Sequence, residues 1–139
     1  MKTASPYQLT VMTPEKTFFD GETTQIIVRT ASGDIGVMAH HISLVASLPS
    51  GPLRIRQEDG SWRTAALSTG LMKVGNNKVS IFANAVEWAE DIDVDWAKRS
   101  EEDARRRIEE KKSDRDFQLA ELKLKRALNR ISVHDSSIK

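Results

Sequence analysis

Histidines are the side chains of this 139-residue chain most able to bind a metal or transfer a proton. They are His40, His41 and His134, and the chain contains no cysteine. Adjacent residues on an extended segment point to opposite faces, so we expect His40 and His41 not to share a metal ion. The lack of cysteine excludes disulfides, thiolate metal sites and cysteine nucleophiles. No metal site is predicted.

Other patterns of enzymes are also missing. Neither G-x-x-x-x-G-K-[ST] nor G-x-G-x-x-G occurs, and Gly33-Asp34-Ile35-Gly36 is a single G-x-x-G, for which we expect a tight turn. No spacing supports a Ser/His/Asp triad. Asp91 and Asp93 are expected to cap a helix rather than to form an acid–base pair. The sequence therefore predicts a chain with no active site of its own.

A run of three arginines, Arg105–Arg107, could in principle bind nucleic acid. Each has an acid four residues earlier, and no aromatic residue for base stacking lies between them. The expected pairs are Glu101–Arg105, Glu102–Arg106 and Asp103–Arg107. With 21 Lys and Arg against 20 Asp and Glu, the formal net charge of +1 gives no general attraction to nucleic acid or anionic membranes.

Targeting and membrane-spanning segments are not apparent. No apolar run approaches the roughly 18 residues needed to span a bilayer, and the N-terminus lacks the apolar stretch of a secretory signal. We expect a soluble, intracellular chain that neither binds nucleic acid nor inserts directly into a membrane.

The distribution of glycine and proline divides the chain into two parts. All seven glycines and all four prolines precede residue 76, whereas charged residues crowd the last third. Glycine and proline punctuate short strands, and a charge-dense segment without them suits long helices. We predict a β-sandwich domain over residues 1–86, a linker over 87–92, an antiparallel two-helix hairpin over 93–135 and a tail over 136–139.

Short segments rich in β-branched or alternating residues predict strands in the first part, at Tyr7–Met12, Gln25–Thr30 and Leu53–Arg56. Asp59-Gly60 and Gly75-Asn76-Asn77 predict hairpin turns. Strands and turns at this spacing are typical of a sandwich or a small barrel.

Two helices are predicted in the second part. Asp91 or Asp93 would cap the first, and Ser113, with Asp116 three residues later, would cap the second. The apolar stripe of the first helix is narrow and includes Ala97 and Ala104. Because this face is weakly apolar, we expect the hairpin to depend on a neighbour for much of its stability.

Five short motifs stand in order along nearly the whole chain, at Ser32–Gly36, His41–Leu44, Leu67–Gly70, Ala89–Val94 and Leu124–Arg130. Together they resemble the motifs of the epsilon subunit family of bacterial F-type ATP synthases. The resemblance implies a non-catalytic rotor subunit of the complex that couples proton flow to ATP synthesis. It also implies a peripheral location on the cytoplasmic face of the cell membrane.

The resemblance further implies that the sandwich binds the gamma subunit and sits on the ring of c subunits, with Asp34 and His41 as ring contacts. Asp34 could instead be a turn residue and His41 a surface imidazole. Ala39, His40 and Ser43 stand where the family usually has Pro, Gly and Pro, so the backbone of this loop need not match the family's.

In that family the hairpin moves between a compact state and an extended state that reaches into the alpha/beta catalytic head and blocks ATP hydrolysis. A weakly apolar, charge-rich hairpin suits two packings of similar energy. We hypothesise the same inhibitory role here. A free-standing adaptor or ATP sensor is the alternative, and an enzyme is a distant third; stable association with gamma and the c ring would separate the first two.

In some Bacillus-type relatives the compact hairpin binds ATP through an I-D-x-x-R-A motif. The resemblance places candidate ATP ligands at Glu87, Ile92, Asp93, Ala97, Arg126 and Arg130. Trp96 replaces the motif arginine, and Asp103 replaces a further one. Each lost arginine–phosphate hydrogen bond contributes about 1.5–3 kcal/mol, so two losses predict an affinity roughly 10²–10⁴-fold lower. We expect weak or absent binding of ATP as a regulatory ligand, and no required cofactor.

Overall fold

The computed structural model describes residues 4–137 and separates two compact units, a β unit that ends at Trp88 and a helical unit that begins at Ala89. The division falls inside the segment 87–92, where a linker was expected. Strand β8 (Lys78–Trp88) extends into this segment, and a 3-10 helix, η1 (Ala89–Asp91), follows it. β8 runs beyond the expected boundary at residue 86 because it keeps its pairing with β7 (Trp62–Gly75) as far as Trp88.

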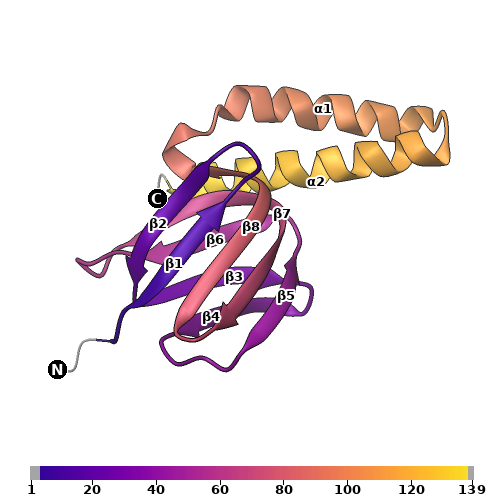
Figure 1. Cartoon of the computed structure of the whole chain (residues 1–139). Coiled ribbons are helices and arrows are strands. Elements are labelled where there is room, and N and C mark those ends of the chain that lie inside the picture. Colours follow the sequence, from indigo (N-terminus) through magenta and orange to yellow (C-terminus); the bar gives the residue numbers. More distant parts are fainter. Residues whose placement is uncertain (1–3, 138–139) are drawn as a thin grey trace. The chain divides into compact units, whose positions relative to one another are not determined.

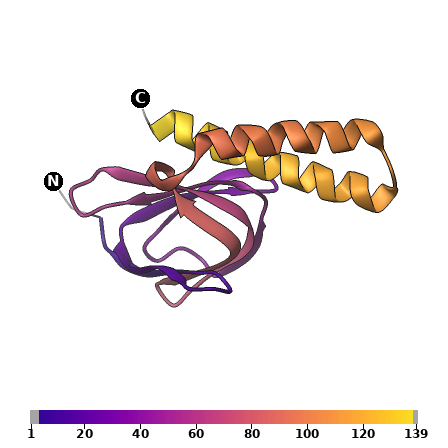
Figure 2. The same cartoon turned by 90° about the horizontal axis from the view of Figure 1, so that it is seen from above.

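The β unit is built from antiparallel pairs, with one parallel pair between β1 and β8. The remaining strands are β1 (Tyr7–Met12), β2 (Thr17–Thr23), β3 (Gln25–Thr30), β4 (Gly33–Met38), β5 (Leu44–Leu48) and β6 (Gly51–Arg56) (Figure 1). The strand order is β2-β1-β8-β7-β6-β3-β4, and β5 also pairs with β7. Figure 2 shows these strands curving around a single core, as expected for an all-β unit.

Strand β7 pairs with both β6 and β5 and so connects these two strands within the sheet. Along one edge it pairs first with β6, over residues 62–67, and then with β5, over residues 70–74. Between them Thr69 has a positive φ of 36° and interrupts the register with β8. Such an irregularity bends a strand and increases its twist. β6 and β5 can therefore diverge from the same edge of β7 and enclose the core.

The core consists of side chains that alternate inward along the strands. Leu9 and Val11 of β1 are fully buried, as are Ile26 of β3 and Ile81 of β8. The predicted strands Tyr7–Met12 and Gln25–Thr30 are confirmed with the expected bounds. Burying a large aliphatic side chain stabilises a fold by about 1.5–3 kcal/mol, so these residues hold the β unit together.

Both predicted hairpin turns are present. The Ser61 backbone amide and hydroxyl donate to Asp59 Oδ1 at 2.9 and 2.5 Å, which closes the β6–β7 turn. Asn76 and Asn77 connect β7 to β8 with φ values of 53° and 54°. Positive φ at both central residues is the geometry of a two-residue hairpin turn, and asparagine tolerates it.

The expectation of a tight turn at Gly33–Gly36 is wrong. The turn is formed by the two residues before it, Ala31 and Ser32, and β4 begins at Gly33. Asp34 is therefore a strand residue opposite Arg29 of β3. The strand was missed because it carries two glycines and most of its residues are exposed, so it shows no apolar alternation.

The helical unit contains η1, α1 (Val94–Glu110) and α2 (Asp114–Ser137). Figures 1 and 2 both show α1 and α2 side by side and antiparallel. The two expected alternatives for the first cap are resolved, because Asp93 accepts a hydrogen bond from the Trp96 amide at 3.0 Å whereas Asp91 lies in η1. Ser113 Oγ likewise accepts from the Asp116 amide at 3.0 Å.

The connection between the helices needs no glycine. Lys111 takes the left-handed conformation, with φ 45° and ψ 50°, and its amide donates to the Arg107 carbonyl. This is the usual αL ending of a helix, although the position is more often glycine. No helix within residues 4–137 is long and apolar enough to cross a membrane.

Candidate functional site

The histidines do not form a metal or catalytic centre in the described structure. His40 has a φ of 65° and its amide donates to Asn77 Oδ1, so the expectation of an extended segment at His40 and His41 is wrong. His41 Nδ1 lies 2.8 Å from the Ile42 carbonyl oxygen. Across residues 4–137 no three His, Asp or Glu side chains gather in a way that could hold a metal ion.

Of the two candidate ring-contact residues, Asp34 lies on β4 and His41 lies in the segment that follows it. Asp34 is near the start of β4 and forms an exposed ion pair with Arg29, at 3.1 Å between Nε and Oδ1. His41 follows the end of the strand, in the segment before β5. Four residues of strand, about 13 Å, separate Asp34 from Met38, so Asp34 and His41 do not form one compact site. Ile42, beside His41, is 79% exposed, and such exposure of an isoleucine suits a partner contact better than a free surface.

An apolar row runs across the outer face of three strands of the β unit. It consists of Leu71 on β7, Phe82 on β8 and Met12 on β1, which are consecutive cross-strand neighbours. Leu71 is 43% exposed and Phe82 is 46% exposed. Val45 of β5, also exposed, pairs with Lys73, two residues from Leu71, and extends the apolar surface.

This apolar row was missed in the sequence, although a signal was present. Leu71-Met72 and Ile81-Phe82 are adjacent apolar residues on strands whose side chains alternate between two faces. Met72 and Ile81 fill the core, so their neighbours must face outward. Apolar residues on both faces of a strand indicate that both faces are covered in the working molecule. The apolar row is therefore the strongest interface candidate of the β unit.

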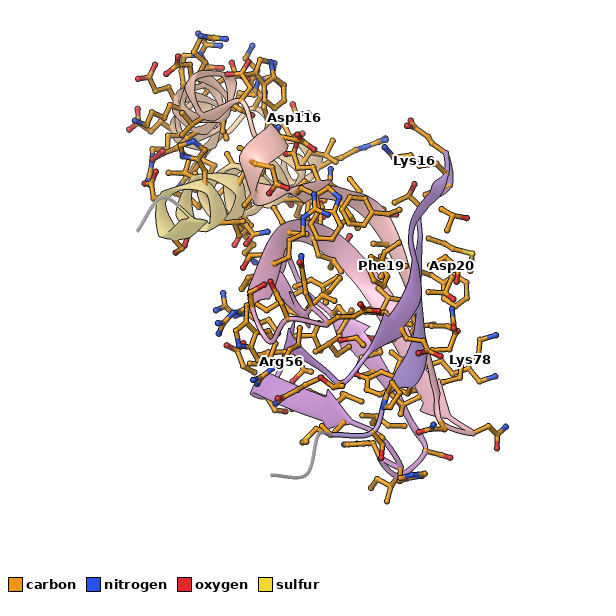
Figure 3. The ribbon with its side chains drawn as sticks, turned by 90° about the vertical axis from the view of Figure 1, so that its left-hand side faces the viewer. Lys16, Phe19, Asp20, Arg56, Lys78 and Asp116 are labelled. Carbon is orange, nitrogen blue, oxygen red and sulfur yellow. The ribbon has the colours of Figure 1, made fainter. Side chains whose placement is uncertain are left out.

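Three arginines and two tryptophans stack near the β6–β7 turn. Trp62 lies below the guanidinium groups of Arg54 and Arg56, at 4.9 and 5.4 Å from the ring centroid. Arg63 lies 3.6 Å from the Trp88 ring centroid. Figure 3 shows Arg56 at the end of its strand, and Asp20 and Lys78 on other parts of the same unit. Stacking on the indole rings holds these guanidinium groups in place, so the arginine side chains are ordered.

The candidate ATP ligands are divided between the two units. Glu87 lies in β8 of the β unit, and the other five belong to the helical unit. Ile92 is 6% exposed and Ala97 is fully buried, so both serve packing. The Asp93 carboxylate is occupied as the cap of α1. These three residues have structural roles that do not require a nucleotide.

The two substituted positions of the nucleotide motif both contact α2. The Arg130 guanidinium lies 4.7 Å from the centroid of the Trp96 ring. Lys123 Nζ lies 2.6 Å from Asp103 Oδ2. The hydrogen bond from Lys123 lowers the pKa of Asp103, with Arg106 and Arg107 assisting. Arg126, which lies between Lys123 and Arg130 in sequence, keeps a buried Nε without a hydrogen-bond partner in the described structure.

The expected ion pairs along α1 are partly confirmed. Arg105 pairs with Glu101 at 3.4 Å, and Arg107 pairs with Asp103 at 3.1 Å. Arg106 was expected to pair with Glu102 but contacts Asp103 at 2.5 Å and Glu110 at 3.8 Å. Asp103 pairs with both Arg106 and Arg107, and because it also faces α2, it pairs with Lys123 as well. All three arginines of the run are thus paired with acidic residues of α1, although Arg106 has different partners from the expected one.

Comparisons with known proteins agree with this architecture. Residues 6–89 match the family model "ATP synthase, Delta/Epsilon chain, beta-sandwich domain", and residues 90–135 match "ATP synthase, Delta/Epsilon chain, long alpha-helix domain". The predicted sandwich followed by a helical hairpin is confirmed by these two matches. They meet between residues 89 and 90, close to the division between the two units.

Relatives at the level of whole chains carry one description. The chain is 44% identical over 128 residues to the ATP synthase epsilon chain of Ruminococcus albus, covering 91% of this chain and 95% of the relative. It is 40% identical over 131 residues to that of Caldicellulosiruptor bescii, covering 94% and 95%. The same fold occurs in a chain of the Euglena gracilis mitochondrial ATP synthase, in a structure of OSCP, F1 and the c-ring. The TM-score is 0.77 and the identity 22%, and the match covers 94% of this chain and 80% of that one. The chain therefore belongs to the ATP synthase epsilon chain family, as its motifs indicated.

Proposed function

We propose that the chain is a central-stalk rotor subunit of a proton-translocating F-type ATP synthase and has no active site of its own. The observation that carries this proposal beyond the family is the apolar row on the outer face of the β unit. A half-exposed phenylalanine and leucine in contact across strands are costly to leave in water and are typical of a surface that a partner covers. Epsilon chains are non-catalytic subunits, which agrees with the lack of enzyme motifs.

The apolar row is our proposed surface for the gamma subunit. The row lies on hydrogen-bonded strands, so its backbone needs no ordering when a partner binds, which suits a permanent interface. The proposed contact with the c-subunit ring involves His41 and the exposed Ile42. Asp34 would also contact the ring, and its ion pair with Arg29 holds it in position. On this proposal the protein is peripheral, at the cytoplasmic face of the cell membrane.

The helical hairpin is our proposed inhibitor of ATP hydrolysis, through extension into the alpha/beta catalytic head. The buried residues of α1 are small, namely Ala97, Ser100 and Ala104. Burial of small side chains contributes little free energy, so a compact and an extended packing can be close in stability. The narrow apolar stripe of the first helix led to the same expectation from the sequence.

ATP binding to the hairpin is proposed to be weak or absent. A triphosphate needs several cationic hydrogen-bond donors, but Trp96 and Asp103 remove two arginines, and the Asp103 carboxylate repels phosphate. Of the two remaining candidate arginines, Arg130 lies over the Trp96 ring, whereas Arg126 has no such contact in the described structure and keeps a buried Nε without a hydrogen-bond partner, so Arg126 is the residue to test. Titration of ATP with magnesium to about 10 mM, followed by heteronuclear NMR, would detect even millimolar binding. If shifts occur, Arg126→Ala should abolish them; shifts that persist would exclude the site.

The rotor role is tested by association with purified gamma subunit and c-ring. We expect the wild-type chain to co-purify with both. Leu71→Glu combined with Phe82→Glu should weaken binding to gamma by roughly 30-fold or more, because two half-exposed apolar side chains each contribute about 1 kcal/mol or more on burial. Leu119→Glu is the matched control, because Leu119 is also an exposed leucine, at 55%, but lies on α2.

A wild-type chain that binds neither gamma nor the c-ring would overturn the rotor proposal and favour the free-standing adaptor or ATP sensor. If the double variant binds gamma as tightly as the wild type, the rotor role stands but the apolar row is not the gamma surface. Far-UV circular dichroism of each variant distinguishes lost binding from lost folding.

A further inference from the structure

We call the hairpin closed when α1 packs against α2, and open when the two helices separate. We infer that two contacts between the helices stabilise the closed hairpin and that no nucleotide is needed to hold α1 against α2. The contacts are Trp96 with Arg130, and Asp103 with Lys123. Each joins a residue of α1 to a residue of α2, unlike the ion pairs of Arg105 and Arg107, which stay within α1. Closure of the hairpin is thus a property of the chain itself.

The spacing of the two contacts makes them act on one side of the hairpin. Trp96 and Asp103 are seven residues apart on α1, and Lys123 and Arg130 are seven residues apart on α2. Seven residues are two helical turns, or roughly 10 Å. The contacts therefore repeat with the same register along antiparallel helices. Such a pair resists both sliding and splaying of the helices, which one contact alone would not do.

The chemistry of the two contacts differs. Asp103–Lys123 is an ion pair with side chains 24% and 37% exposed, so salt weakens it. Trp96–Arg130 is a cation–π contact in which a flat guanidinium lies over an indole, and it depends less on salt because the contact is also apolar. Loss of either contact should raise the ratio of open to closed hairpin by about two- to five-fold.

The same two contacts occupy Arg130 and Lys123, two cations that could otherwise bind a phosphate. Arg130 lies over Trp96 and Lys123 is bound to Asp103, so a triphosphate on this face would have to displace a contact that already joins the helices. A ligand that binds open and closed states equally shifts nothing. Because the hairpin is already closed without a ligand, ATP can shift its open–closed equilibrium only slightly.

The test measures the distance between α1 and α2 in the isolated full-length chain by pulsed electron paramagnetic resonance. The chain has no cysteine, so two introduced cysteines are the only labelling sites. Lys98 and Ser132 are suitable positions, because both are exposed and lie toward the end of the hairpin away from its connection. The wild-type distance distribution should be dominated by a short population, unchanged by ATP with magnesium.

Trp96→Leu and Lys123→Ala should each add a longer population, and the double variant should make it prominent. Trp96→Phe, which keeps an aromatic ring, should restore the short distance. Lys125→Ala is the matched control for Lys123→Ala, because Lys125 pairs with Glu121 on its own helix. KCl at about 1 M, where the Debye length is roughly 3 Å, should lengthen the distances of Trp96→Leu more than those of Lys123→Ala.

Two results would overturn the inference. One is a wild-type hairpin that is open without ATP and closes when ATP is added. The other is a short distance that survives in the double variant, with helicity retained by circular dichroism. Since only the isolated chain is measured, neither result depends on whether the hairpin inhibits hydrolysis in the assembled complex.

Discussion

Replacement of Gly70 by alanine should strongly destabilise the β unit. A Cβ at this position would lie 2.5 Å from the Phe82 carbonyl oxygen and 3.1 Å from the Ala83 Cα, both backbone atoms of β8. Ordinary contact begins near 3.4 Å, so β7 and β8 would have to separate by roughly 1 Å where β7 bends. This is the physical reason for glycine in the Leu67–Gly70 motif.

The expected cost combines two terms. Overpacking costs about 1–3 kcal/mol, and a weakened strand hydrogen bond adds about 0.5–1.5 kcal/mol. The sum is about 1.5–4.5 kcal/mol, and for a unit of this size each kcal/mol lowers Tm by about 4–8 °C. Urea unfolding followed by tryptophan fluorescence is the assay, because Trp62 and Trp88 both lie in the β unit.

Gly75→Ala is the matched control for Gly70→Ala. Gly75 ends the same strand, but the nearest atom to its Cβ would be the Ser43 hydroxyl oxygen at 3.4 Å, an ordinary contact with a side chain. We expect this control to change stability by less than about 1 kcal/mol. If Gly70→Ala proves as stable as Gly75→Ala, the close approach of β8 to Gly70 is refuted.

Three further predictions concern Asp103 and Tyr7. The hydrogen bond from Lys123 lowers the pKa of Asp103 below its usual 3.8, so Asp103 supports the closed hairpin above that pH and loses this support as pH falls through the lowered value. Asp103→Asn should therefore remove this part of the acid-induced opening. Equal acid sensitivity of the variant and the wild type would contradict this prediction. Burial raises the pKa of Tyr7, the only tyrosine, so the native chain should show no phenolate absorbance at about pH 10–11, where an exposed tyrosine ionises. Tyr7→Phe should cost about 1–2 kcal/mol in urea unfolding, because the Val37 carbonyl loses the hydroxyl that donates to it at 2.6 Å; an unchanged midpoint would refute this role.

Strands with one buried face could be predicted from sequence, and those without one could not. β1 alternates buried and half-buried residues along its whole length, and its bounds were predicted correctly. β4 has a single buried residue, Val37, and two glycines, so nothing in its pattern marks a strand. β7 continues through Thr69-Gly70 as a bent strand, and the positive φ of Thr69 that marks this bend has no signal in the alternation of its residues.

The contacts that join the two helices were beyond sequence analysis for a different reason. Pairs four residues apart follow from helix geometry alone, and two of the three expected pairs are present. Lys123 is twenty residues from Asp103, so their contact depends on the length of the connection and on the register of α2 against α1. The motif showed that Trp96 and Asp103 depart from the nucleotide-binding pattern, but only the structure gave them partners.

The most direct test of the account is ATP hydrolysis by the purified, reconstituted ATP synthase complex, with either the full chain or a chain truncated after Glu90. The truncated chain keeps all eight described strands and should still assemble with the complex. Hydrolysis should be faster with the truncated chain at equal occupancy, because the hairpin that we propose as inhibitor is gone. Equal hydrolysis rates for the two complexes would contradict the inhibitory role, and failure of the full chain to assemble would contradict the rotor role itself.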